Sequence, residues 1–275
     1  MVHPTNPGYK ISVVWALSAV GLELILFRVF FPSVLVKLFV QFVFGFVIFY
    51  GHRVTARPSG LLAKLLNFAG LVLSLLTRIL GAGAVPEAAR LVRSGTVVAF
   101  PTDTVYGLAC DPWSDEAVSR LFTLKGREKK PVPVLCSGFD EASAVVRLEG
   151  TSLELARRFW PGALTIVAPL RRRVPELLDQ GTGFLGVRVP DHPLALSLAR
   201  ELGGWTSGTS ANISGQPSCT TAGQVVAQLG DRLEAVLDGG QTPGGESTVV
   251  KVVGGSIEVL RRGKISVEPG TSESS

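Results

Sequence analysis

The sequence has few of the residues that build metal centres and disulfide frameworks. Its 275 residues include three cysteines, three histidines and one methionine. The cysteines have no paired spacing, which excludes a disulfide scaffold and a cysteine-based zinc site. Because His3, His52 and His192 are scattered along the chain, a histidine-ligated metal is not expected either.

The common nucleotide-binding motifs are also missing. There is no GxxxxGK[ST] segment, and no GxGxxG segment follows a predicted strand and opens a helix. Any nucleotide site must therefore use other groups. Only 18% of the residues are charged and the mean hydropathy is +0.36, which excludes a disordered chain.

The net charge of +5 is unevenly distributed. Residues 1–84 hold seven of the 27 basic residues and one of the 22 acidic residues, so the other 191 residues hold 20 and 21. The alkaline pI of about 9.3 therefore belongs to the N-terminal third. The nearly neutral remainder is long enough for a real core. It lacks the excess of Lys and Arg that strong binding to nucleic acid requires, so we expect no such binding.

Residues 1–84 are strongly apolar. The ranges 11–31, 33–50 and 61–80 each approach the ~20 residues that a membrane-spanning helix needs. They predict hydrophobic N-terminal helices and membrane association through residues 11–80, with the remaining domain in the cytoplasm and tethered to the membrane. The last segment could instead lie in the interface as an amphipathic helix. A further alternative is translation from a non-Met start near Val85, which would give a soluble cytoplasmic protein.

From Val85 onward, helical and strand patterns interleave without regular βαβ spacing, which predicts an α/β domain with a mixed sheet over residues 85–270. Residues 271–275 are predicted to be a flexible tail. Helices are expected at 86–95, 115–125, 153–160, 193–202 and 221–229, and strands at 96–101, 132–136, 164–169, 186–190, around 236, 247–253 and 257–260.

Three segments carry groups suited to ligands. Thr102, Asp103 and Thr104 follow a predicted strand, where ligands bind in α/β sheets. Lys125-Gly126-Arg127 places two cations around a glycine, which suits an anion, although a basic helix end is usually only a cap. Arg188 lies between valines on a predicted strand, so it needs either a structural ion pair or a ligand carboxylate.

Taken in order, the segments of residues 85–265 resemble the YrdC/Sua5 family of L-threonylcarbamoyladenylate synthases. The resemblance rests on PTDTVYGL, KGR, FWPGALT, VRVPDHP, SANISGQPS, ESTVV and LRRG. It implies an open, twisted mixed sheet with flanking helices and a large concave cavity, in the short, single-domain form. It also implies a nucleotidyltransferase that makes threonylcarbamoyl-AMP and pyrophosphate from L-threonine, bicarbonate (or CO2) and ATP. The product feeds the modification of adenosine 37 in tRNA.

The resemblance assigns roles to individual residues. It implies that Lys125, Arg127, Ser210 and Asn212 are catalytic and bind ATP, that Thr104, Arg188 and Ser247 bind threonine, and that Thr220 and Arg261 also contact ATP. Mg2+ would arrive on the triphosphate, since no carboxylate cage for a metal is evident. The downstream partner would be a tRNA threonylcarbamoyl transferase complex.

The chain departs from the family pattern at three places. Asp103 replaces a frequent Glu, Val134–Cys136 lacks a His that some members carry, and Phe184 replaces a frequent Thr that contacts ATP. Two other functions are weighed as alternatives: a module that binds double-stranded RNA, and a membrane-associated regulatory protein without synthase activity. The intact KGR, SAN and EST segments argue against a degenerate domain.

Overall fold

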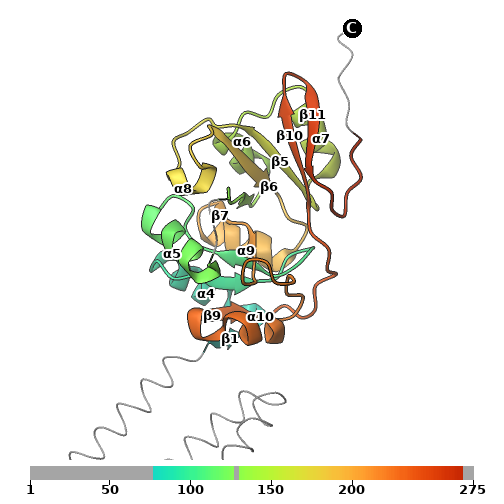
Figure 1. The fold of residues 1–275 in the computed structure, drawn as a ribbon. Helices are drawn as coiled ribbons and strands as arrows, with labels where there is room; N and C mark the ends of the chain where they lie inside the picture. Colours follow the sequence, from blue (N-terminus) through green and yellow to red (C-terminus); the bar gives the residue numbers. More distant parts are fainter. Residues whose placement is uncertain (1–76, 127–129, 269–275) are drawn as a thin grey trace, which may run out of the picture. The chain divides into compact units, whose positions relative to one another are not determined.

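The computed structural model describes residues 77–126 and 130–268, which form two mixed β-sheets with helices around them (Figure 1). The first sheet has the order β1 (Arg78–Leu80), β9 (Ala235–Leu237), β2 (Val98–Phe100), β3 (Gly107–Ala109) and β8 (Thr209–Ser210). The second has the order β11 (Ser256–Arg261), β10 (Thr248–Val253), β5 (Leu164–Pro169), β6 (Phe184–Arg188), β4 (Val134–Cys136) and β7 (Trp205–Ser207).

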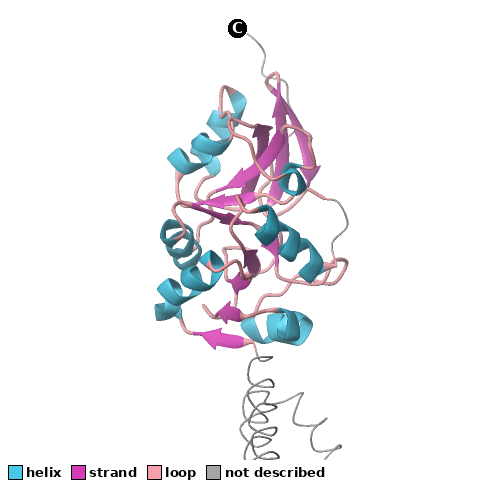
Figure 2. Ribbon diagram, turned by 90° about the vertical axis from the view of Figure 1, so that its left-hand side faces the viewer, coloured by secondary structure: helices cyan, strands magenta, loops and turns pink. Residues whose placement is uncertain are grey.

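Seven α-helices of the described part flank the two sheets (Figure 2). They are α4 (Val85–Arg93), α5 (Asp115–Lys125), α6 (Phe139–Val145), α7 (Thr151–Phe159), α8 (Glu176–Asp179), α9 (Pro193–Glu201) and α10 (Ala222–Leu229). Two 3-10 turns, Ala82–Ala84 and Gly230–Arg232, complete the regular structure of these residues. The expected mixed α/β fold is confirmed, but the strands divide into two sheets where the sequence predicted one.

Local sequence signals explain where the helices begin and end. The Ser114 side chain accepts a hydrogen bond from the Ala117 N–H and so caps the start of α5. Gly126 ends that helix in the left-handed conformation (φ 55°), which glycine adopts without a steric penalty. Thr221 caps α10 in the same way as Ser114, through the Gln224 N–H.

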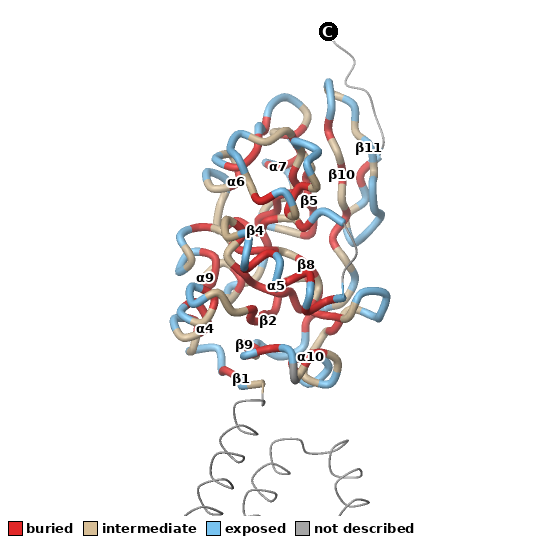
Figure 3. The backbone as a smooth tube through the Cα atoms, turned by 60° about the vertical axis from the view of Figure 1, so that its left-hand side comes forward, coloured by how far each residue is buried: buried red, intermediate tan, exposed pale blue. Residues whose placement is uncertain are grey.

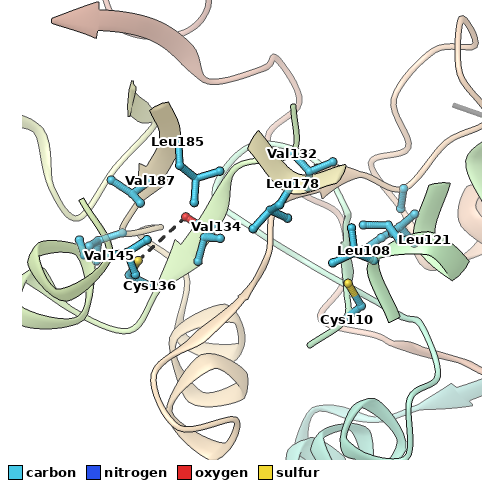
Figure 4. Packing of buried hydrophobic residues seen from close by; sticks show 14 of the residues in the cluster. Leu108, Cys110, Leu121, Val132, Val134, Cys136, Val145, Leu178, Leu185 and Val187 are labelled. Atoms are coloured by element: carbon cyan, nitrogen blue, oxygen red, sulfur yellow. Dashed lines mark hydrogen bonds between the residues drawn. The ribbon is translucent and has the colours of Figure 1, made fainter. Parts of the chain in front are cut away.

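The core lies between the strands and the inner faces of the helices (Figure 3). Strands β2, β3, β4 and β9 are buried along their whole length, so they appear in the sequence as short apolar runs without alternation. Cys110 and Cys136 pack among Leu and Val side chains there (Figure 4). Burial raises the pKa of the Cys110 thiol to about 12, which keeps it in the protonated form.

The first strand corrects one prediction from the sequence. Residues 78–80 belong to the apolar segment 61–80 that was assigned to a membrane-associated helix, but they form β1, which pairs in parallel with β9. The side chain of Leu80 is buried in the core beside α4. Packing inside the domain therefore accounts for the apolar residue at this position. This strand also lies upstream of the boundary predicted at Val85. The rest of the predicted hydrophobic region, and the predicted tail at 271–275, lie outside the described residues.

Within residues 77–126 and 130–268, no helix is long and apolar enough to cross a membrane.

Candidate active site

Two adjoining cavities of about 600 Å³ each lie between the sheets and their connecting loops. The first is lined by β5, β6, β10 and β11 on one side and by residue 102 and the segments 104–107 and 208–210 on the other. The second lies at the end of α5 and along residues 210–216. Lys130, Ser210, Glu246 and Arg261 line both, so a single ligand could extend from one cavity into the other.

Arg188 lies at the end of β6 and is almost completely buried, with a side chain 6% exposed. Its Nε donates to the Gly162 carbonyl (2.8 Å), Nη1 donates to Thr104 Oγ1 (3.2 Å), and Nη2 pairs with Asp103 Oδ1. Burial lowers the pKa of Arg188 and the Asp103 carboxylate opposes that effect. The ion pair does not use all of the donors, because two of the five N–H groups make no hydrogen bond to another described residue.

The neighbours of the Thr104 hydroxyl determine which hydrogen bonds it donates and which it accepts. Thr102 Oγ1 donates to the Val105 carbonyl (2.6 Å), so the bond of 2.9 Å between the two threonine hydroxyls must use the Thr104 proton. Thr104 Oγ1 also accepts from Arg188, which leaves it one free lone pair. At the wall of the cavity this hydroxyl can only accept, so it suits an amine or a hydroxyl donor on a ligand.

A second arginine lines the cavity from the same sheet. Arg261, at the end of β11, donates to the Ser247 carbonyl (2.9 Å) and to Ser247 Oγ (2.9 Å), and it pairs with Glu246 (2.7 Å). Ser247 Oγ lies 3.0 Å from Thr165 Oγ1 on β5. The motif LRRG thus holds the motif ESTVV in place, which the sequence alone did not reveal.

Gly263 allows this arrangement because its backbone touches the backbone of residues 246–248. A Cβ on Gly263 would lie 2.3 Å from the Glu246 carbonyl oxygen and 2.5 Å from the backbone of Ser247 and Thr248. Only a residue without a side chain fits there. The Lys264 N–H donates to the same Glu246 carbonyl (3.0 Å), which closes the contact.

The second cavity is built around a buried lysine. The Lys125 ammonium donates to the Ser210 carbonyl, to the Asn212 carbonyl (2.9 Å) and to Asn212 Oδ1 (3.2 Å). Ser210 Oγ donates to Asn212 Oδ1 (2.5 Å), and Asn212 Nδ2 donates to the carbonyls of Ile213 and Gln216. Three of the four residues predicted from the KxR…SxN signature therefore form one hydrogen-bonded cluster.

Not every predicted residue is placed at a cavity. Arg127 lies outside the described residues, and Thr220 lines neither cavity; its hydroxyl donates to Gln224 Oε1 (3.1 Å) at the start of α10. Phe184 does line the first cavity, where the Lys251 ammonium lies 4.4 Å from the centre of its ring. The position where the family resemblance leads us to expect Thr is thus an aromatic wall in this chain.

Four residues take part in the site without a role predicted from the sequence, although Asp103 was identified there as a group suited to a ligand. Asp103, Gly162, Thr165 and Glu246 all hold a predicted site residue in place. Each belongs to a quoted motif, so the signal was present, but it did not say which neighbour each residue would contact.

Charge in the cavities favours anions. Lys125, Lys130, Arg188, Lys251 and Arg261 line them against two acids, Glu246 and Glu258. Among the residues that the structure describes, no three His, Cys, Asp or Glu side chains gather closely enough to hold a metal ion. The excess of cations therefore suits an organic anion.

Comparison with known proteins agrees with this chemistry. The sequence profile of the Sua5/YciO/YrdC family, described as telomere recombination, matches residues 90–263. Both cavities, all the quoted motifs and all strands of the two sheets except β1 lie in that range. The fold and the site define an α/β domain with an anion-binding cleft, and this chain belongs to the Sua5/YciO/YrdC family.

Curated relatives in this family are named threonylcarbamoyl-AMP synthase. That of Bacillus subtilis is 40% identical over 194 residues (67% of this chain, 54% of the relative), and that of Pyrococcus abyssi 38% over 184 residues (66% and 54%). A relative from Klebsiella pneumoniae is 38% identical over 160 residues (57% and 84%). The chain therefore spans about half the length of the first two relatives and most of the third.

A solved structure of the Pyrococcus abyssi protein, Sua5 complexed with L-threonine, superimposes with a TM-score of 0.65. It is 36% identical in sequence and the match covers 68% of this chain and 58% of that one.

Proposed function

We propose that this protein is an L-threonylcarbamoyladenylate synthase, which forms threonylcarbamoyl-AMP and pyrophosphate from L-threonine, bicarbonate and ATP. The observation that carries the proposal is the junction of the two cavities. A guanidinium fork with hydroxyl neighbours lies in one cavity and the Lys125–Ser210–Asn212 cluster in the other, and they share the wall at Ser210, Glu246 and Arg261. The names of the curated relatives support the same activity.

The first cavity suits the amino acid. Its carboxylate would lie against the free N–H groups of Arg188, because a planar fork matches two carboxylate oxygens. The acceptor lone pair of Thr104 would face the substrate amine or hydroxyl, and Ser247 would approach from another part of the cavity wall. The complex of the Pyrococcus abyssi relative with L-threonine supports an amino acid of this kind.

The second cavity suits the phosphates. The reaction joins the threonine amine to bicarbonate as a carbamate, with loss of water. A carbamate oxygen then bonds to the α-phosphorus of ATP while the bond from that phosphorus to pyrophosphate breaks. No covalent nucleophile on the protein is needed, so positioning and neutralisation of charge carry the step. Ser210 and Arg261 line the junction where this exchange would take place, and Asn212 lines the second cavity beside it. Arg127 is proposed for the triphosphate by family resemblance.

Mg2+ is proposed to enter with ATP rather than to reside on the protein. Glu246 is the only acidic residue of the described part that lines the second cavity, and it already pairs with Arg261. Mg2+ commonly takes one or two carboxylates and completes its coordination with water and substrate phosphates. Glu246 could supply one such carboxylate.

The direct test uses the full chain, because β1 pairs with β9 and a chain cut at Val85 would lose it. The protein is incubated with L-threonine, bicarbonate and Mg-ATP, and pyrophosphate and threonylcarbamoyl-AMP are measured. We expect both products only when threonine is present. Pyrophosphate release that does not depend on threonine, or no release, would refute the synthase.

Membrane association through the apolar residues that precede β1, within 11–77, and supply of the product to a tRNA threonylcarbamoyl transferase complex are also proposals. The first rests on the apolar N-terminal sequence alone. Fractionation of the native protein tests it: recovery in the membrane pellet is expected, and a soluble protein whose N-terminus maps near Val85 would overturn it.

A further inference from the structure

We infer that Asp103 is a positioning residue, which orients the Arg188 guanidinium so that its free edge receives the carboxylate of the amino-acid substrate. This inference rests on the proposed function and adds a residue to it. Asp103 lies in the turn between β2 and β3, next to two residues that line the cavity.

Three residues from two segments fix the plane of the guanidinium. Gly162, after α7, accepts from Nε (2.8 Å), Thr104 accepts from Nη1 (3.2 Å), and Asp103 accepts from Nη2. Because the guanidinium is rigid and planar, three contacts in different directions leave it no rotation. Only Asp103 among these partners carries charge, so it makes the strongest of the three contacts.

Asp103 acts through Arg188 and not on the ligand. Thr102 and Thr104 both line the first cavity, whereas Asp103 between them does not. Its side chain is 15% exposed, and its backbone carbonyl accepts from Lys264 Nζ (3.3 Å). The turn therefore directs two hydroxyls inward and holds the carboxylate behind the arginine.

The charge balance supports the same role. Arg188 is buried and lies close enough to Arg261 for the two cations to repel each other, and both effects lower the Arg188 pKa. The Asp103 carboxylate opposes both effects. When no ligand is present, its negative charge neutralises the buried Arg188 guanidinium. Without Asp103, the fork would lose both its neutralising charge and the contact that sets its direction.

The test compares Asp103→Asn, which keeps the shape and removes the charge, with the wild-type full chain. Calorimetric titrations measure the Kd of L-threonine and of ATP, and steady-state assays measure KM and kcat. We expect the threonine Kd and KM to rise about tenfold or more, because one partner of a buried charge pair is lost. The ATP Kd should stay within about twofold, and Asp103→Glu should restore most of the threonine affinity.

Asp191→Asn is the matched control, since Asp191 is a solvent-exposed carboxylate nearby that does not contact Arg188. It should leave both affinities unchanged. If Asp103→Asn binds threonine as the wild type does, or loses both ligands equally with a lower Tm, the positioning role is wrong. Should the Asn variant not fold, a folded Asp103→Ser variant with unaltered threonine affinity would overturn it.

The outcomes separate this inference from the proposed function. A wild-type chain that binds no threonine would overturn both. A wild-type chain that binds threonine, together with an Asn variant that binds it equally well, would overturn the inference alone.

Discussion

Replacing the buried Lys125 by methionine tests whether this lysine holds the Ser210–Asn212 segment or contacts the nucleotide directly. The two roles differ because its ammonium already donates to three oxygens of that segment. Methionine keeps most of the side-chain volume and removes the charge and all three donors. The family resemblance assigns Lys125 to the triphosphate, whereas the geometry gives it a structural task first.

The magnitude follows from the contacts. Three hydrogen bonds from a charged donor contribute about 1.5–3 kcal/mol each. The variant no longer buries an ammonium group, and this offsets several kcal/mol of the loss. A net destabilisation of about 2–4 kcal/mol remains, which corresponds to a Tm lower by about 4–16 °C for a domain of this size.

Thermal unfolding followed by circular dichroism and ATP titration of the full chain provide the measurement. We expect the lower Tm and, because Ser210 and Asn212 lose their anchor, an ATP Kd raised by about tenfold or more. Arg120→Met on the same helix is the control. Arg120 pairs at the surface with Glu116 (3.2 Å), so its loss should cost only about 0.3–0.5 kcal/mol.

Two results would refute this reasoning. An unchanged Tm with unchanged ATP binding would mean that the three hydrogen bonds contribute nothing. An unchanged Tm with strongly weakened ATP binding would show that Lys125 contacts the triphosphate directly, as the resemblance implies, and does not hold the segment.

Three further predictions concern other parts of the site and the core. Arg188→Ala should weaken threonine use about 30-fold or more, because a buried fork is lost, and change the ATP Kd little; equal losses of both substrates would contradict its role. Gly263→Ala should destabilise the domain by about 1–3 kcal/mol in urea unfolding. Gly83→Ala is the control and should not destabilise it, because the space around its Cβ is open. Equal urea midpoints for the two variants would be inconsistent with the close contact at Gly263. Since the Cys110 pKa is about 12, iodoacetamide at pH 8 should label this buried thiol only after unfolding, and mass spectrometry that finds it labelled in the folded protein would disprove this.

Elements with local signals were predicted well from the sequence. Helix α5 has a capping Ser114, an apolar stripe and Gly126 at its end, and its bounds match the prediction. Strand β5 also matches. The elements that were missed, α6, α8, β3, β7 and β8, have two to seven residues, and their short sequences do not fix their conformation without tertiary pairing.

The site was predictable as a set of chemical groups but not as a set of contacts. The hydroxyls, the amide and the cations were all identified in their motifs. The pairs Thr104–Arg188 and Thr165–Ser247 each join residues more than 80 positions apart, and no local pattern encodes such a pair. Arg188 illustrates the difference, since the sequence offered an ion pair and a ligand fork as alternatives and the structure gives the arginine room for both.

The short strand β1 has a consequence for how the domain withstands truncation. It covers one side of β9, and the Asp238 N–H donates to the Leu80 carbonyl (2.7 Å) at the end of the pair. Removing residues before Val85 would uncover the backbone donors and acceptors of β9 at a sheet edge. Such a chain would tend to associate with itself edge to edge, so aggregation of a shortened protein would report the loss of a strand and not an unstable core.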